Sequence, residues 1–114
     1  MAIKNRPEFE KFIRRVEKSS DEFRASSTEK RHSKQYRTAR ENLAHLVDED
    51  SFLEFGQFAV AAQRNRRDYE ELQDKTNADG IITGFCSVNS GLVGSESSQA
   101  VAIVYDYSVL AGTQ

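Results

Sequence analysis

The first candidates for chemistry in this 114-residue chain lie near its C-terminal end. Asp106 follows an apolar run that ends at Tyr105, and a carboxylate there could act as a general acid or base. Strand-end acids more often accept hydrogen bonds from backbone N–H groups of the next loop, which favours a structural role. Ser108 and Thr113 carry hydroxyls, but no base can be assigned to activate them, so we assign no catalytic residue.

Two small residues, Ala111 and Gly112, are the candidates for ligand binding. They follow a predicted strand, and small side chains there allow backbone N–H groups to approach a thioester or phosphate oxygen. The same pair also occurs in ordinary turns. Ligand binding at these two positions is therefore a prediction that needs support from elsewhere in the chain.

The cysteine and the histidines give little support for a nucleophile or a metal site. Cys86 lies in the middle of a predicted strand, where a buried thiol behaves as a small hydrophobic side chain, and no nearby group would activate it as a nucleophile. His32 and His45 have no cysteine or carboxylate at a ligand spacing, so no metal is predicted. A single cysteine excludes an internal disulfide and indicates a reducing compartment, the cytoplasm.

A basic run of six Lys and Arg residues, from Arg24 to Arg40, is another candidate site. Such a run could bind the phosphates of a nucleic acid or a cofactor. Nucleic-acid sites usually interleave aromatic residues with the charges, and Tyr36 is the only one here. The solvated face of a helix is the favoured interpretation, and no nucleic-acid partner is predicted.

Composition indicates at most one globular domain. Hydrophobic residues make up 38% and charged residues 30% of the chain, the net charge is -2, and no apolar run is long enough for a membrane helix. No membrane partner is therefore predicted. Because no Lys or Arg follows Lys75, we expect the C-terminal strands to be buried on both faces by elements outside this chain.

The elements that would position these residues form an α/β protein, or α+β as a fragment, with two N-terminal helices followed by a small sheet. Apolar spacing predicts a helix over 7–23, followed by a polar break at 26–28. Thr38, with Glu41 three residues later, has the spacing of a capping box for a second helix that ends near Val47. Strands are predicted over 52–55, 81–88 and 100–107, a turn at 89–91, a loop at 94–99, and either helix or loop over 63–75.

Three segments, taken in order, resemble the N-terminal part of the carboxyltransferase (beta) subunit of biotin-dependent acyl-CoA carboxylases, of the acetyl- and propionyl-CoA carboxylase type. Residues 38–56 contain T-A-R-E, a leucine-containing helix and S-F-L-E-F-G; residues 79–84 read D-G-I-I-T-G; residues 106–113 read D-Y-S-V-L-A-G-T. The resemblance covers 36–114, which we take as the incomplete carboxyltransferase domain, with 1–35 as a helical extension. It departs from the family in an additional loop at 91–99 and in Ala111, where the family has glycine.

The resemblance implies the front portion of a crotonase-like fold, a spiral of ββα units. The parent enzyme would move a carboxyl group from carboxybiotin to the α-carbon of an acyl-CoA in cytoplasmic fatty acid metabolism. Its biotin would sit on a carrier, with biotin carboxyl carrier protein and biotin carboxylase as partners, and the parent would be a homo-oligomer. The family's oxyanion loops lie downstream of the third segment, so the fragment itself is expected to be inactive. Ala111 and Gly112 would lie near coenzyme A.

Two alternatives stay open from the sequence. The parent could be a subunit of a biotin-dependent acyl-CoA decarboxylase, which shares the family resemblance. The chain could instead be a helical interaction module that binds a partner through the apolar stripe from Phe9 to Val16 or through the basic face.

Overall fold

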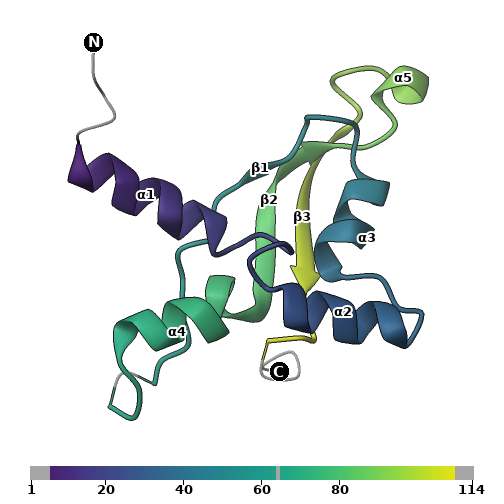
Figure 1. The fold of residues 1–114 in the computed structure, drawn as a ribbon. Coiled ribbons are helices and arrows are strands. Elements are labelled where there is room, and N and C mark those ends of the chain that lie inside the picture. The colour runs from purple at the N-terminus through teal and green to yellow at the C-terminus, as the bar shows by residue number, and fades with distance from the viewer. Residues whose placement is uncertain (1–5, 64, 110–114) are drawn as a thin grey trace.

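A computed structural model describes residues 6–63 and 65–109 of the chain. Within these ranges the protein is mixed α and β, as predicted, with helices on one side of a small sheet (Figure 1). The helices are α1 (Pro7–Glu17), α2 (Ala25–Ser33), α3 (Ala39–Leu46), α4 (Tyr69–Lys75) and α5 (Ser90–Val93). The strands are β1 (Leu53–Glu54), β2 (Ile81–Ser87) and β3 (Gln99–Tyr105). No helix of the described part is long and apolar enough to cross a membrane.

The sheet is antiparallel throughout, in the order β1-β2-β3. β2 and β3 pair along their whole length, from Ile81 opposite Tyr105 to Ser87 opposite Gln99. β1 is only two residues long and pairs Leu53 with Phe85. Because the side-chain period of a strand is two, this register divides the sheet into two faces with different surroundings.

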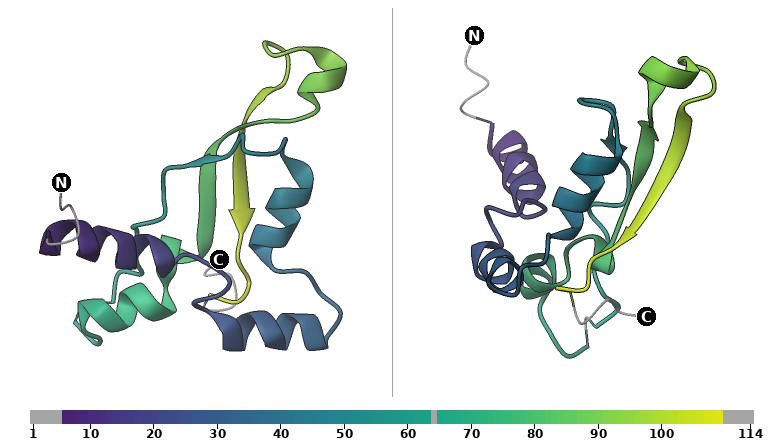
Figure 2. Two further views of the ribbon diagram at one scale, coloured as in Figure 1. Left: turned by 45° about the horizontal axis from the view of Figure 1, so that its top comes forward. Right: turned by 90° about the vertical axis from the view of Figure 1, so that its right-hand side faces the viewer.

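One face of the sheet packs against α3 and forms the core (Figure 2). Ala39 and Leu43 of α3 lie against Ile82, Cys86 and Ala102 of the strands, all of them buried. The prediction that Cys86 is a buried thiol is confirmed. Its side chain is part of the hydrophobic contact between helix and sheet.

The opposite face of the sheet is apolar and exposed. Its large side chains are between 55% and 67% exposed, namely Leu53, Phe55, Phe85, Val101, Ile103 and Tyr105. Phe55 and Phe85 are in contact, with ring centroids 5.1 Å apart. No helix lies over this side of the sheet (Figure 2). Soluble proteins rarely leave a contiguous apolar patch of this kind open to water. The prediction that elements outside this chain bury both faces is wrong for the face that α3 covers. For the exposed face it stays a prediction.

The predicted capping box at the start of α3 is confirmed. Thr38 Oγ1 accepts a hydrogen bond from Glu41 N at 3.1 Å, and Glu41 Oε1 accepts one from Thr38 N at 2.8 Å. Thr38 Oγ1 also donates to Asp21 Oδ2 at 2.6 Å, which joins the segment before α2 to the start of α3.

Replacing Thr38 should therefore destabilise the fold. Thr38→Ala is expected to lower the free energy of unfolding by about 1–2 kcal/mol, because it removes the cap and leaves the N–H of Glu41 unpaired. Thr38→Ser keeps the hydroxyl and serves as the control in chemical denaturation. A Thr38→Ala variant as stable as Thr38→Ser would contradict the assigned cap.

The helical N-terminal region differs from the prediction in two ways. The first helix ends at Glu17 rather than near residue 23, because Ser19 and Ser20 Oγ donate back to the carbonyls of Val16 and Glu17 at 2.6 and 2.7 Å. The polar break predicted at 26–28 is wrong: these residues lie inside α2. α2 buries no residue, so it has no apolar periodicity by which the sequence could reveal it.

Asp48 joins the end of α3 to the end of β2. Its carboxylate accepts hydrogen bonds from Ser87 Oγ at 2.6 Å, Asn89 N at 3.0 Å and Ser90 N at 3.1 Å. These bonds, above all those from the side chain of Ser87 and from Ser90, lower the pKa of Asp48 from its ordinary value.

The lowered pKa predicts an acid-dependent loss of stability. A carboxylate whose pKa is lower when folded stabilises the protein above its unfolded pKa, about 3.9, and loses that contribution as the pH falls through the folded pKa. Asp48→Asn should therefore flatten the fall in stability below about pH 4. Asp50→Asn, at an exposed position, is the matched control. Identical pH profiles for the two variants would contradict the assignment.

Candidate functional site

The turn that follows β3 is fixed by Asp106, whose predicted structural role is confirmed. Asp106 Oδ1 accepts hydrogen bonds from Ser108 N at 3.0 Å and from Ser108 Oγ. Val109 N donates to Asp106 O at 3.0 Å, and the side chain of Val109 is fully buried. The predicted strand 100–107 therefore ends at Tyr105, where this turn begins. These bonds fix the backbone of residues 106–109. Ala111 and Gly112, the predicted ligand-binding positions, follow shortly after in the sequence and lie outside the described residues.

Arg24, from the segment between α1 and α2, closes this turn from the other side. Its Nη1 lies 2.9 Å from Asp106 Oδ2, and its Nη2 donates to Ser108 Oγ at 3.0 Å and to Ser108 O at 3.3 Å. The side chains of Arg24 and Asp106 are only 13% and 17% exposed. An arginine fork that bonds two groups in a largely dry site is both strong and directional. Sequence reasoning missed this contact, since no local pattern links residues 82 positions apart.

A strained turn before β2 makes a hydrogen bond with the turn after β3. Ala78, Asp79 and Gly80 all have positive φ, at 56°, 49° and 78°, a conformation that only glycine adopts without cost. Gly80 O accepts a hydrogen bond from Asp106 N at 2.8 Å, and Asn77 Oδ1 accepts one from Arg15 Nη1 at 2.7 Å. The D-G of the second motif thus lies in a turn that touches both α1 and the start of the turn after β3.

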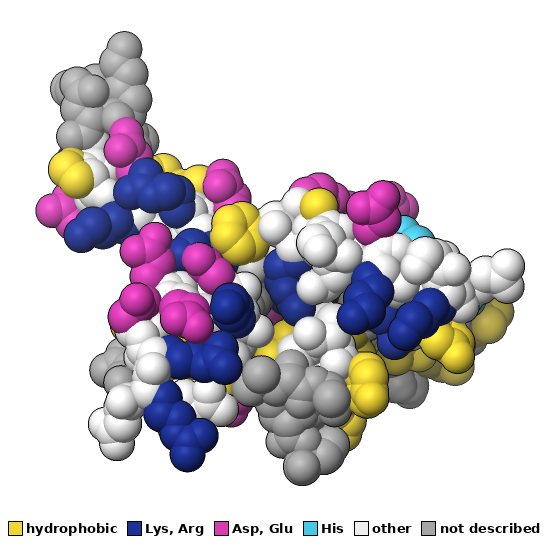
Figure 3. Space-filling view, turned by 60° about the horizontal axis from the view of Figure 1, so that its bottom comes forward, with side chains coloured by type: hydrophobic (Ala, Val, Ile, Leu, Met, Phe, Trp, Pro, Cys, Tyr) yellow, Lys and Arg dark blue, Asp and Glu magenta, His cyan; other side chains and the backbone are white. Residues whose placement is uncertain are grey.

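The basic run from Arg24 to Arg40 does not form one patch. Besides the bonds of Arg24, Arg40 makes a bidentate pair with Glu54 at 3.0 and 3.0 Å. Arg31 donates to the backbone oxygen of Arg37 and lies over the ring of Tyr36. Figure 3 shows Lys and Arg side chains interspersed with Asp and Glu over this side of the molecule. The three arginines that bond within the protein are structural, so the run has few side chains left for phosphate binding.

A shallow pocket of about 310 Å³ lies beside the turn after β3. Ser26 and Ser27 of α2, Lys75 of α4 and Ser108 of the turn line it, together with Arg24. Polar groups from three parts of the chain therefore converge next to the segment that leads to Ala111 and Gly112. Within the described ranges, this pocket brings together Arg24 of the basic run and Ser108 of the turn after β3.

The histidines do not assemble a metal site in the described residues. His32 Nε2 lies 2.8 Å from Glu41 Oε1, a carboxylate already engaged in the cap of α3. No group of three or more potential metal ligands occurs in the parts of the chain that the structure describes.

Solved structures related to this chain are enzymes that act on acyl-CoA. The chain is similar to a single-chain, multi-domain long-chain acyl-CoA carboxylase, with 45% identity over 96% of this chain and a TM-score of 0.92. It is also similar to transcarboxylase 12S in two structures, with 31% identity over 76% of this chain (TM-score 0.56) and 28% over 98% (TM-score 0.61). It spans 11%, 15% and 19% of those chains. No family model and no curated protein matches the chain.

The fold is therefore that of a segment found in an acyl-CoA carboxylase and in a transcarboxylase. Over most of its length the chain is thus similar to part of these enzymes, in agreement with the resemblance to a carboxyltransferase domain.

Proposed function

We propose that this chain is the N-terminal part of a carboxyltransferase that moves a carboxyl group from carboxybiotin to the α-carbon of an acyl-CoA. The observation that carries this proposal is the 45% identity to a long-chain acyl-CoA carboxylase at a TM-score of 0.92. The transcarboxylase structures contain methylmalonyl-CoA or its hydrolysis product, which supports an acyl-CoA as substrate. The higher identity to the carboxylase favours a carboxylase over a transcarboxylase for the parent protein, by which we mean the full-length protein that carries this chain.

The part played by this chain would be to position acyl-CoA. Arg24 and Asp106 hold the turn at Ser108, and Ser108 lines the pocket between α2 and α4. We place Ala111 and Gly112 against coenzyme A, where their backbone N–H groups would donate to a thioester or phosphate oxygen. No residue of this chain is assigned a catalytic role.

Biotin supplies the carboxyl group when it is bound to a carrier protein, and no described residue of this chain is assigned to it. Biotin carboxyl carrier protein and biotin carboxylase are the proposed partners. A homo-oligomeric parent is supported by the hexamer assembly of transcarboxylase 12S. We further propose a cytoplasmic location and a domain boundary near residue 35.

Carboxyl transfer by the parent protein tests the proposal. The parent is incubated with a carboxylated biotin donor, labelled in the carboxyl group, and with acyl-CoA substrates from acetyl-CoA to long-chain acyl-CoA. Label should appear in the carboxylated acyl-CoA, whereas the 114-residue chain alone should give no turnover. No transfer to any acyl-CoA, from a donor that a known carboxyltransferase uses, would contradict the proposal. Transfer seen only in the reverse assay, from a carboxylated acyl-CoA labelled in its carboxyl group to biotin, would favour the decarboxylase alternative.

A further inference from the structure

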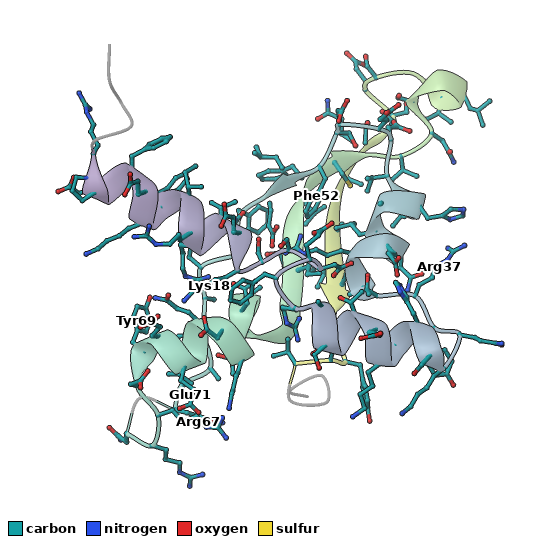
Figure 4. The ribbon with its side chains drawn as sticks, in the orientation of Figure 1. Lys18, Arg37, Phe52, Arg67, Tyr69 and Glu71 are labelled. Atoms are coloured by element: carbon teal, nitrogen blue, oxygen red, sulfur yellow. The ribbon has the colours of Figure 1, made fainter. Side chains whose placement is uncertain are left out.

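A second pocket, of about 760 Å³, lies between α1 and α4, outside the site described above. Both helices contribute side chains to its lining, as does Phe58 of the loop that precedes α4. Figure 4 shows Lys18 and Tyr69 in the space between the two helices. The volume lies within the range of pockets that bind small molecules.

Positive charge is concentrated on the α1 side of this pocket. Lys11, Arg14, Arg15 and Lys18 all line it, and their spacing of i, i+3, i+4 and i+7 places them on one face of the helix. Like charges at these spacings repel one another and destabilise a helix. A face of this composition is therefore more stable when an anion lies against it.

Contacts within the protein neutralise only part of this charge. Lys18 Nζ pairs with Asp74 Oδ1 at 2.6 Å, and Arg15 bonds to the neutral Asn77. Two acids, Glu8 and Glu70, also line the pocket, so acids are outnumbered by the four bases there. Burial lowers the pKa of Arg15 from its ordinary value, with Tyr69 and Asp74 opposing the shift, yet the guanidinium stays charged near neutral pH.

Aromatic rings lie beside the cations. Phe12 and Phe58 meet edge to face with centroids 5.9 Å apart, and the guanidinium of Arg15 lies 5.3 Å from the centre of the Phe58 ring. Phe12, Phe58 and Tyr69 line the pocket while 43–50% exposed. Exposed rings next to Lys and Arg are the combination that binds a nucleobase by stacking and its phosphates by charge.

We propose that the pocket between α1 and α4 binds an adenine nucleotide, with its phosphate against the basic face of α1 and its base against Phe12 and Phe58. The ligand chemistry has two possible sources: the phosphoadenosine end of a coenzyme A molecule, or a free nucleotide such as ADP. This inference does not rest on the proposed function, because charge, ring geometry and pocket size carry it.

Isothermal titration calorimetry at low salt tests the proposal. The 114-residue chain is titrated separately with coenzyme A, 3′,5′-ADP, 5′-ADP and inorganic phosphate. At least one nucleotide should bind about tenfold or more tightly than phosphate, because stacking adds to the charge interaction. Tighter binding of coenzyme A and 3′,5′-ADP identifies the first source, and tighter binding of 5′-ADP the second. Affinities that are equal to that of phosphate for all three nucleotides would overturn the proposal.

Matched variants locate the binding. The double variant Lys11→Glu/Arg14→Glu changes two exposed positions and should weaken nucleotide binding at least about tenfold. Lys30→Glu/Lys34→Glu, at exposed positions on α2 and just after it, should change binding less than about twofold. Phe12→Leu keeps the apolar volume and should weaken nucleotide but not phosphate binding. Circular dichroism confirms that each variant is folded. Equal losses in the two double variants would show non-specific charge attraction and would overturn the assigned site.

Discussion

Gly84→Ala is expected to lower the free energy of unfolding by about 3 kcal/mol or more. We expect a larger effect here than for the same change at Gly56 or Gly91. A Cβ at Gly84 would lie 2.4 Å from Leu53 O and 2.5 Å from Phe52 Cε1. Leu53 O is a backbone atom of β1, so it cannot move away without disturbing the β1–β2 pairing. Gly84 is the last residue of the D-G-I-I-T-G motif, and its requirement is therefore steric. Denaturant unfolding of the variant gives the change in free energy.

Two other glycines provide matched controls. A Cβ at Gly91 would meet no atom within 4 Å, so Gly91→Ala should leave the free energy of unfolding nearly unchanged. A Cβ at Gly56 would meet the hydroxyl of Thr83 at 2.5 Å, the end of a side chain that can rotate, so Gly56→Ala should have an intermediate effect. Equal effects of Gly84→Ala and Gly91→Ala would contradict the close approach of Phe52 to β2.

Arg24→Met should be the most damaging change at a charged residue, at about 3 kcal/mol or more. It removes the partner of Asp106 and leaves that carboxylate mostly buried without its counter-charge. The turn at Ser108 would lose two hydrogen bonds from the same guanidinium. Arg67→Met breaks a partly exposed pair with Glu71 and is the control, with an expected cost below about 1 kcal/mol.

A double-mutant cycle separates the ion pair from other effects of the substitution. Because Arg24 and Asp106 contact each other, Arg24→Met and Asp106→Asn together should cost less than the sum of the single changes. Additive costs would show that Arg24 acts on the fold in some way other than through Asp106. In the parent protein we expect Arg24→Met to raise the KM for acyl-CoA more than it lowers kcat.

Elements that are stabilised by residues close together in the sequence could be predicted from local patterns. Thr38 and Glu41 satisfy each other within one turn, so the start of α3 could be predicted from spacing alone. β2 and β3 could be predicted from their apolar runs. α2 could not, because its nine residues bury nothing and its polar composition is equally typical of a loop. The early end of α1 depends on the side chains of Ser19 and Ser20, which compete with the helix for its last carbonyls.

The candidate site was only partly predictable for a different reason. The bonds of Asp106 to Ser108 are local, and the sequence predicted that Asp106 has a structural role. The pairing of Asp106 with Arg24 joins two distant segments and depends on the tertiary fold. Binding of coenzyme A at Ala111 and Gly112 stays a prediction, because both residues lie outside the described ranges.

We propose that the segment after β3 binds acyl-CoA and that Arg24 holds this segment in position. Amide hydrogen exchange of the parent protein, measured with and without saturating coenzyme A on peptides that cover residues 100–114, tests this most directly. We predict slower exchange in these peptides when coenzyme A is bound, and a smaller effect in Arg24→Met than in Arg67→Met. Unchanged exchange over residues 100–114 in a parent protein that demonstrably binds coenzyme A would contradict the claim.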